Sequence, residues 1–342
     1  MRAAFFKSHG GPDRIRVGDV PDPVLAPGEA LVRVRACALN RLDLWTLANT
    51  PGLSVSLPHI GGADVFGVVE SAPNGALAKA GDEVVLSPGL SCGSCPACKA
   101  GRDNLCGEFR ILGLQIGGGL AEKISIPAQN LVPAGASLSP EEWAALPVTF
   151  MTAWHMLSTR AGIKPGSWVF VQGAGSGVGC AAIEVAKFVG AKVLAAARTE
   201  SKRARAIAAG AEAAFDPADP ALPARVRAAT GGAGADIVVE HIGGTVFEKS
   251  LECLAPGGRL VTCGATIGAE ARVDLLSLFW RERSVLGSML GTHRELLDMV
   301  SLARSGVLKP VVDRVFPLSE ARAAYARLAS GEAYGKVVVR IS

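Results

Sequence analysis

Aromatic side chains, long apolar runs and tracts of one charge are all scarce in this chain of 342 residues. Aromatic residues make up only 5%, and no stretch interleaves them with basic side chains as nucleic-acid-binding segments do. The net charge of +4 is spread without a basic block. No apolar run approaches the ~20 residues of a membrane-spanning helix, and the first residues lack a signal-peptide core. We therefore expect a cytoplasmic protein that binds neither nucleic acid nor a membrane.

Charged residues are also few, at 19%, whereas apolar residues make up 49% of the chain. This balance argues against disorder and is ample for a large buried core. The length fits one large domain or two ordinary ones. No internal repeat or low-complexity tract divides the chain further.

Cysteine is present, and four of the eight cysteines lie together at Cys92, Cys95, Cys98 and Cys106. In a cytosolic protein of this size, such a cluster indicates a metal site rather than disulfides. Four thiolates saturate a tetrahedral zinc ion and leave no open position for a substrate. We predict one structural Zn²⁺ that ties down a lobe over residues 91–107.

Residues 167–203 predict a dinucleotide-binding unit. An apolar strand over 168–171 is followed by closely spaced glycines, an amphipathic helix and a second apolar strand over 192–197. Glycines let the backbone approach a pyrophosphate, and the helix N-terminus offers it free N–H groups. The glycine spacing does not match G-x-G-x-x-G strictly, and a tight turn without a ligand is the plainer alternative.

Apolar strands and helical segments alternate through the rest of the second half, which predicts an α/β fold with a doubly wound parallel sheet. The first part reads as a compact, mostly β domain, and a helix over 141–158 leads out of it. The terminal strand is expected to return to that first domain. The expected strands are 30–36, 67–70, 83–86, 213–215, 236–240, 259–263, 284–290 and 336–340, and the later helices are 246–254 and 293–304.

Several motifs together resemble the medium-chain dehydrogenase/reductase superfamily, and they cover essentially the whole chain. They are the segments 36–45, 61–71, 81–86, 117–131, 144–154, 173–179 and 254–264, together with the cysteine cluster. The resemblance implies a GroES-like catalytic domain over 1–149 and 291–342, interrupted by a Rossmann domain over 150–290. It also implies an active site in the cleft between the domains and a homodimer formed through the last Rossmann strand.

The chain departs from the zinc alcohol dehydrogenases of this superfamily at every catalytic zinc ligand. The first ligand position falls on Asn40, the Gly-His-Glu triplet falls on Gly62-Ala63-Asp64, and the last ligand falls near Val148 or Thr149. Catalytic zinc needs three good ligands and an open position. The pattern instead resembles the quinone oxidoreductases and enoyl reductases, which use no catalytic metal.

The resemblance implies a catalytic set of Asn40, Asp43, Asp64 and Thr149, and it places Asn40 nearest the nicotinamide ribose. Asn40 is equally compatible with a turn that closes a strand. Asp43 and Asp64 are compatible with a role in ordering the loop. Cys37 and His59 leave open an unfamiliar metal site with Asp64, although a buried thiol is the plainer interpretation.

The implied cofactor set combines the glycine turn, the end of the second strand and later loops. Its members are Thr152, Gly175, Ser176, Gly177, Val178, Gly179, Arg198, Lys202, Arg203, Gly264, Ala265 and Met289. The second strand ends without the acidic residue that accepts from the ribose 2′-hydroxyl of NAD. Arg198, Lys202 and Arg203 can pair with a 2′-phosphate, although a solvated basic helix start near Glu200 is the alternative. We predict NADPH as the cofactor.

These features together predict NADPH-dependent hydride transfer to a quinone or an α,β-unsaturated carbonyl. An alcohol dehydrogenase with a non-standard zinc site is the alternative within the same class. A non-catalytic NADPH-binding regulatory protein is the alternative from a different class.

Overall fold

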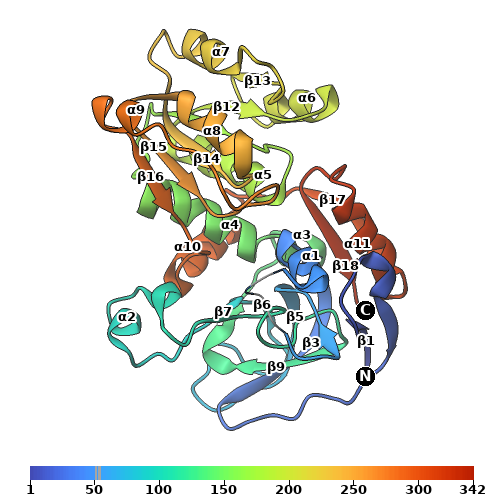
Figure 1. Cartoon of the computed structure of the whole chain (residues 1–342). Helices are drawn as coiled ribbons and strands as arrows, with labels where there is room; N and C mark the ends of the chain where they lie inside the picture. The colour runs from blue at the N-terminus through green and yellow to red at the C-terminus, as the bar shows by residue number, and fades with distance from the viewer. Residues whose placement is uncertain (51, 53–54) are drawn as a thin grey trace. The chain divides into compact units, whose positions relative to one another are not determined.

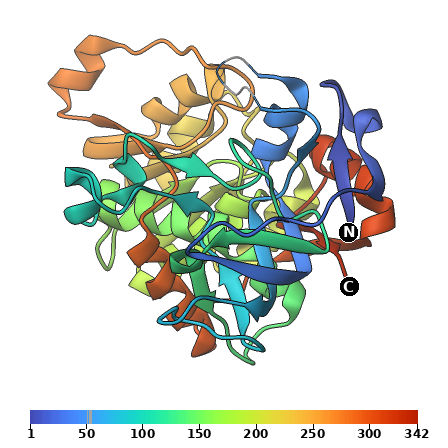
Figure 2. The same cartoon turned by 90° about the horizontal axis from the view of Figure 1, so that it is seen from below.

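The computed structural model describes residues 1–50, 52 and 55–342, and the chain divides into two compact units (Figure 1). Unit 1 comprises Met1–Val148 and Thr292–Ser342, and unit 2 comprises Thr149–Gly291. The domain boundaries predicted from the sequence each lie one residue from these junctions. Both chain ends belong to unit 1, and they lie close together in two views at right angles (Figures 1 and 2).

A seven-stranded sheet with the order β10-β6-β5-β3-β18-β17 forms the centre of unit 1, and β9 pairs with β3 beside this path. Its strands are β3 (Glu29–Leu39), β5 (Asp64–Ser71), β6 (Glu83–Leu86), β9 (Lys123–Pro127), β10 (Leu131–Pro133), β17 (Val312–Pro317) and β18 (Lys336–Arg340). Strand β18 pairs antiparallel with β3, with Val337 opposite Leu39. The predicted return of the terminal strand to the first domain is therefore confirmed.

Alternation of side chains along β3 shows why this strand is central. Ala30, Val32 and Val34 are fully buried, whereas the residues between them are partly exposed. Helix α3 (Pro140–Ala145) packs on β3, β5 and β18, so the end of β3, from Ala36 to Leu39, is buried on both faces. Asn40, which follows β3, lies at this buried end of the sheet together with Asp64 and Lys336, which begin β5 and β18.

Smaller elements complete unit 1. The short strands are β1 (Arg2–Phe6), β2 (Arg16–Asp19), β4 (His59–Ile60), β7 (Gly89–Leu90) and β8 (Arg110–Ile111). The further helices are α1 (Arg41–Ala48), α2 (Pro96–Lys99), α10 (His293–Arg304) and α11 (Ala321–Ala329). Helix α10 has the bounds that the sequence predicted. No helix in the described part of the chain is long and apolar enough to cross a bilayer.

Unit 2 is a parallel sheet of six strands in the order β13-β12-β11-β14-β15-β16. The strands are β11 (Trp168–Val171), β12 (Lys192–Ala196), β13 (Ala213–Phe215), β14 (Ala235–Glu240), β15 (Leu254–Thr262) and β16 (Ser284–Gly287). The helices of this unit are α5 (Gly177–Val189), α6 (Glu200–Ala208), α7 (Leu222–Ala229), α8 (Gly244–Glu252) and α9 (Leu275–Trp280). In chain order the strands lie 3-2-1-4-5-6, the doubly wound arrangement of dinucleotide-binding domains. The predicted fold class is confirmed.

Two elements differ from the expectation. The predicted helix over 141–158 is broken at Pro147, since a proline lacks the N–H that would continue the ladder. Helix α3 ends before it, α4 (Pro147–Trp154) starts with it, and residues His155–Arg160 continue as a π-helix. The turn predicted at 256–258 lies inside β15 as a bulge, because Ala235 pairs with Leu254 whereas Ile237 pairs with Arg259.

Candidate functional site

The glycine-rich turn of unit 2 connects β11 to the N-terminus of α5. Ser176 caps this helix, and its Oγ accepts from the backbone N–H of Gly179 at 2.9 Å. Gly173 has φ of +60°, which favours glycine. A Cβ on Gly179 would lie 2.4 Å from the carbonyl oxygen of Gly173, so only glycine lets the helix pack this closely on the turn. The turn thus brings closely packed glycine backbone to the N-terminus of a helix, an arrangement that fits a pyrophosphate.

Two residues where β14 ends were not singled out by the sequence analysis, and one of them contacts this turn. Glu240 is fully buried and accepts from the backbone N–H groups of Ile242 and Gly243 at 2.7 and 2.9 Å. Burial raises the pKa of its carboxyl group. His241 follows, and its Nε2 lies 2.7 Å from Ser176 Oγ. The ends of β11 and β14 are therefore joined by a side-chain hydrogen bond directly beside the turn.

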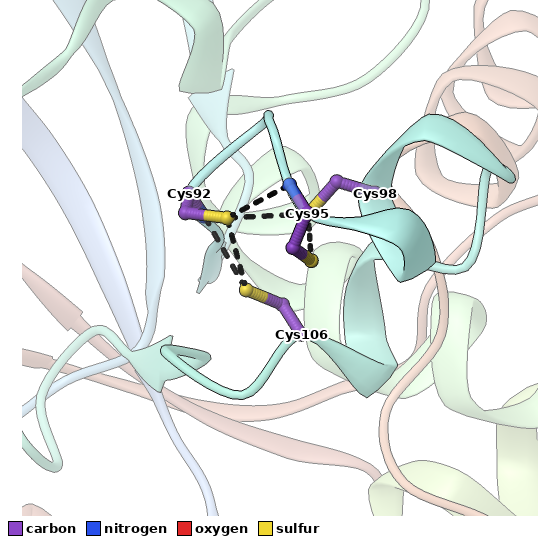
Figure 3. A group of neighbouring side chains, drawn as sticks. All are labelled: Cys92, Cys95, Cys98 and Cys106. Carbon is purple, nitrogen blue, oxygen red and sulfur yellow. Dashed lines mark hydrogen bonds between the residues drawn. The ribbon is translucent and has the colours of Figure 1, made fainter.

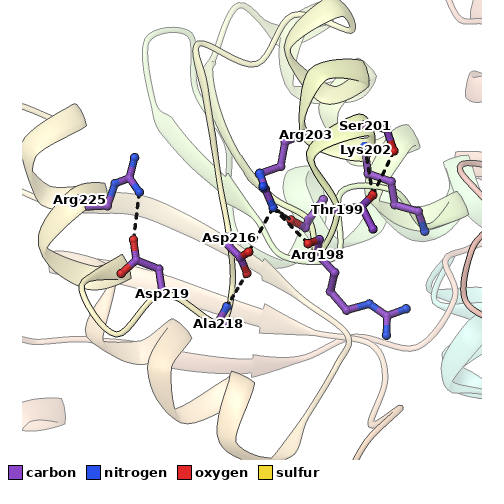
Figure 4. Close-up of polar contacts among 10 residues, drawn as sticks. Arg198, Thr199, Ser201, Lys202, Arg203, Asp216, Ala218, Asp219 and Arg225 are labelled. Carbon is purple, nitrogen blue, oxygen red and sulfur yellow. Dashed lines mark hydrogen bonds and ion pairs between the residues drawn. The ribbon is translucent and has the colours of Figure 1, made fainter.

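The end of β12 carries no acidic residue, and the three basic residues near it differ in environment (Figure 4). Arg203 donates from Nη1 to the carbonyl oxygens of Ala197 and Arg198, and the same atom lies 3.3 Å from Asp216. Its guanidinium group therefore stabilises the strand-to-helix connection. Arg198 is exposed and extends away from Asp216, and Lys202 lies on the first turn of α6. Arg198 and Lys202 are thus better placed than Arg203 to meet a ligand phosphate.

The other predicted cofactor residues lie in three places. Thr152 is buried on α4, beside the equally buried Thr149 of the predicted catalytic set. Gly264 and Ala265 follow β15, and a Cβ on Gly264 would lie 3.0 Å from the carbonyl oxygen of His241. Met289 follows β16 and is partly exposed. Gly264 therefore lies against the same strand end as the glycine-rich turn.

Asn40 and Asp64 meet a third residue, Lys336, which the sequence analysis did not identify as a site residue. Lys336 Nζ lies 2.7 Å from Asp64 Oδ2 and 2.6 Å from Asn40 Oδ1. Asn40 Nδ2 donates to Asp64 Oδ2 at 2.9 Å, and the backbone N–H of Val148 donates to Asp64 Oδ1 at 2.7 Å. Asp64 is 0% exposed and Lys336 is 4% exposed. Asn40, at the first of the ligand positions that the resemblance assigns, thus bonds to a buried ion pair of Asp64 and Lys336.

Asp43 lies on the first turn of α1 and holds two backbone segments of this cluster. Its carboxylate accepts from the backbone N–H of Asn40 and from that of Gly62, both at 2.7 Å. Burial raises the pKa of Asp43 to about 6, against the opposing effect of these two hydrogen bonds. Asp43 therefore orders the backbone on both sides of the ion pair.

The side chains that could share a metal ion lie in the cysteine cluster. Cys37 is buried, and His59 Nε2 lies 3.0 Å from the carbonyl oxygen of Gly113. Within residues 1–50, 52 and 55–342, the only group of three or more Cys, His, Asp or Glu side chains close enough to share one ion is the cysteine cluster. Asp64 therefore lacks the companions that the alternative metal site would need.

The cysteine cluster has the dimensions of a tetrahedral zinc site (Figure 3). The four sulfurs lie within 4.8 Å of one another. The individual distances are 3.9 Å for Cys92–Cys98, 3.5 Å for Cys95–Cys98 and 3.5 Å for Cys92–Cys106. A zinc–sulfur bond of about 2.3 Å gives a tetrahedron with edges of about 3.8 Å. Cys92, Cys95, Cys98 and Cys106 therefore fit the ion, which would be held with no open position.

The lobe that carries these cysteines is anchored on α10. Both carboxylate oxygens of Asp103 accept from the backbone N–H of His293, at 3.3 and 3.0 Å. A carboxylate at a helix N-terminus is favoured by the helix dipole. A metal ion bound in the lobe would therefore also support its contact with the C-terminal part of unit 1.

Comparison with known proteins agrees with both units. Residues 26–136 match the alcohol dehydrogenase GroES-like domain, and residues 177–305 match the zinc-binding dehydrogenase family. The crystal structure of an NAD-dependent alcohol dehydrogenase superposes with a TM-score of 0.96 at 42% identity, with 100% of each chain covered. The human quinone oxidoreductase is 27% identical over 99% of this chain and 97% of its own length. The crotonyl-CoA reductase of Streptomyces avermitilis is 32% identical over 91% of this chain and 78% of its own. The chain therefore belongs to the medium-chain dehydrogenase/reductase superfamily of oxidoreductases, as the sequence motifs predicted.

Proposed function

We propose that this protein is an NADPH-dependent reductase that acts on a quinone or an α,β-unsaturated carbonyl without a catalytic metal. The observation that carries the proposal is the ion pair between Asp64 and Lys336. Asp64 stands next to Ala63, where the resemblance places the histidine ligand of the Gly-His-Glu triplet, and the Lys336 ammonium group already neutralises its carboxylate. The neighbouring positions Ala63 and Val148 offer neither a thiol nor an imidazole. Hydrogen-bond donors are therefore proposed to act where a zinc ion would act in an alcohol dehydrogenase.

When bound, NADPH supplies the hydride from nicotinamide C4. The chain's own contribution is to orient the reactants and to stabilise the substrate oxygen on which negative charge develops. Asn40 is the candidate donor, because its side chain is only partly buried and its Nδ2 carries a second N–H beside the one bonded to Asp64. Water is proposed to supply the proton that completes the reduction.

The proposal of NADPH rather than NADH rests on the end of β12. Ala196, Ala197 and Arg198 occupy the positions where an NAD-binding domain carries an acidic residue. Arg198 and Lys202 supply positive charge there, beside Arg203, which is held by Asp216. The first helical turn of α6 disfavours cations through the helix dipole, and a bound 2′-phosphate would offset that cost.

We also propose a cytosolic homodimer. Strand β16 ends the sheet of unit 2, and the residues before it leave a row of large apolar side chains exposed. These are Leu275, Leu276, Phe279 and Trp280, which are 68%, 69%, 59% and 82% exposed. An open sheet edge beside an apolar surface favours pairing with a second copy. The cytosol is proposed because the four clustered thiols must stay reduced to bind zinc.

An NAD-dependent alcohol dehydrogenase is the second candidate. The structure of a protein with this name is similar along the whole chain at 42% identity. Against this candidate stands the donor set at Asn40, Ala63 and Val148, which lacks the ligands that catalytic zinc requires.

Steady-state oxidation of NADPH with a panel of quinones and enones, beside oxidation of simple alcohols with NAD and NADP, tests the proposal. We expect turnover of at least one quinone or enone, and none of the alcohols. Zinc-dependent turnover of alcohols would establish the dehydrogenase instead. Tight NADPH binding without any turnover would favour the non-catalytic regulatory protein.

A further inference from the structure

We propose that Lys336 is a positioning residue, whose ammonium group fixes the Asn40 amide so that one N–H faces the substrate oxygen. The inference rests on the proposed function, in which Asn40 stabilises the developing negative charge. In this inference, the contacts with Lys336 and Asp64 determine which end of the Asn40 amide faces the substrate.

The sheet of unit 1 brings these three residues together at the ends of three adjacent strands. Strand β3 ends at Leu39, next to Asn40, while β5 begins at Asp64 and β18 begins at Lys336. Strand β3 lies between the other two and is antiparallel to both. Its carboxyl end therefore meets the amino ends of β5 and β18. Side chains that are 272 positions apart in sequence become neighbours by this topology.

The hydrogen-bonding roles in the cluster allow only one orientation of the Asn40 amide. A lysine ammonium group can only donate, and an ionised carboxylate can only accept. Asn40 Oδ1 faces Lys336 at 2.6 Å, and Asn40 Nδ2 faces Asp64 at 2.9 Å. A reversed amide would set N–H groups against the ammonium and a carbonyl oxygen against the carboxylate. Unmade bonds at buried charged groups carry the full cost of desolvation, so the reversed state is disfavoured.

This orientation leaves one N–H of Asn40 available. Nδ2 carries two hydrogens, and only the one directed at Asp64 has an acceptor among the described residues. The ammonium on Oδ1 polarises the amide and so strengthens its N–H groups as donors. The Asp43 carboxylate accepts from the backbone N–H of Asn40 at 2.7 Å, which fixes the backbone from which the Asn40 side chain extends. Asn40 is thereby a preorganised donor of the kind that stabilises an oxyanion.

Stability alone does not explain this ion pair. Lys336 is 4% exposed and Asp64 is 0% exposed, so both charges are removed from water. Replacing a buried ion pair by apolar residues of similar volume is often neutral or stabilising. If the pair is purely structural, removal of both charges together should restore stability and turnover alike. If the pair positions Asn40, stability should recover while turnover stays low.

The test compares Lys336→Met, the double variant Asp64→Asn/Lys336→Met and Asn40→Ala. Lys336→Met keeps the side-chain length but leaves Asp64 without its cation, so we expect a lower melting temperature. The double variant removes both charges and should regain most of that loss. Its kcat for the quinone or enone should nevertheless stay at least about tenfold below wild type, since loss of a whole oxyanion donor lowers kcat 10²–10³-fold. KM and the Kd for NADPH should change by less than about threefold in both variants.

Recovery of kcat together with melting temperature in the double variant would show that the pair is only structural and would overturn the inference. Arg340→Met is the matched control, because it removes a cation from the exposed end of the same strand. Its kcat should equal that of the wild type. A wild-type protein without quinone or enone turnover would refute the proposed function but not the positioning role. That role has its own readout in selectively ¹⁵N-labelled asparagine, where Lys336→Met should abolish the slow solvent exchange of the Asn40 hydrogen bonded to Asp64. Unchanged exchange would refute the inference whatever the activity.

Discussion

Gly61 lies so close to Tyr325 that a Cβ at position 61 would be 2.5 Å from the tyrosine hydroxyl and 2.9 Å from Asp43 Oδ1. Tyr325 belongs to α11 and is buried, with a pKa raised well above the usual range by that burial. Helix α11, helix α1 and the loop before β5 therefore close around Asp43. This packing removes the Asp43 carboxylate from water while its backbone partners remain in place.

The first prediction concerns the pH dependence that follows from Asp43. Its pKa of about 6 in the folded state exceeds the ordinary value of 3.8 for an aspartate. The folded state therefore binds more protons than the unfolded state between these values, and the free energy of unfolding falls as pH rises through this window. At 1.36 kcal/mol per unit, the fall is about 3 kcal/mol. Above pH 6 to 7 this contribution stays constant.

Urea unfolding of the wild type and of Asp43→Asn from pH 4 to pH 8 measures this effect. The unfolding free energy of the wild type should fall relative to that of Asp43→Asn as pH rises from 4 to 6. Above pH 6 the difference between the two proteins should level off. Parallel curves over the whole range would show that Asp43 titrates normally.

The second prediction is one zinc ion per chain that is structural. Removal of the ion should loosen residues 91–107 and weaken the anchor between Asp103 and α10, because metal binding supplies folding free energy to such a lobe. Cys95→Ser should lower the melting temperature and promote aggregation in the same way. Elemental analysis and activity after mild chelation are the measurements. Two zinc ions per chain, or zinc-reversible loss of turnover in a folded chain, would revive the alcohol dehydrogenase.

The third prediction separates the basic residues near the end of β12. Arg198→Ala combined with Lys202→Ala should raise the Kd for NADPH about tenfold or more, since a hydrogen bond to a charged group contributes about 1.5–3 kcal/mol. The Kd for NADH should stay nearly unchanged. Arg203→Ala should mainly lower stability, because it frees the carbonyl oxygens of Ala197 and Arg198.

Fluorescence titration of each variant with both cofactors gives these constants. Arg205→Ala is the control, because this exposed arginine lies on the same helix but away from its first turn. Equal or tighter binding of NADH by the wild type would refute the cofactor preference.

The fourth prediction is that the glycine-rich turn tolerates no side chain at position 179. A Cβ on Gly179 would lie 2.4 Å from the carbonyl oxygen of Gly173, so Gly179→Ala must push the helix from the turn. Overpacking of this kind costs about 1–3 kcal/mol, and the Kd for NADPH should rise as well. Gly117→Ala, at a glycine whose Cβ would meet nothing within 4 Å, is the control and should change neither property.

The sequence predicted the sheet of unit 2 because its signals are local. The buried strands are short apolar runs, and glycines mark the turn between β11 and α5. The cysteine cluster is equally local, with all four sulfurs within fifteen residues. The break at Pro147 was missed because apolar residues continue on both sides of it, although the proline itself was the available signal.

Lys336, Glu240 and His241 could not be identified from the sequence for a different reason. Each follows or opens an apolar strand, where a polar residue usually marks the exposed end. The partners of Lys336 and His241, Asp64 and Ser176, become apparent only when the sheet order is known, and the contact of Glu240 with Gly243 depends on the turn that follows β14. The effect of Asn40→Ala on stability likewise depends on contacts that only the fold reveals. Because Asn40 bonds to the buried ion pair, we now expect a loss of about 1–3 kcal/mol as well as of turnover.

The last prediction is that the chain forms a homodimer through the edge of unit 2. Strand β16 pairs with β15 on one side only, and Trp280 is 82% exposed beside it. Burying this row of side chains would remove apolar surface from water at roughly 25 cal/mol per Å². Trp280→Glu would place a charge in that contact, so we expect dissociation to monomers at micromolar protein concentration. Light scattering coupled to gel filtration measures the mass, and Val307→Glu, at a 46% exposed apolar residue of unit 1, is the control. A wild-type mass of 35.1 kDa would rule out the dimer, and a Trp280→Glu variant that stays dimeric would place the contact on another surface.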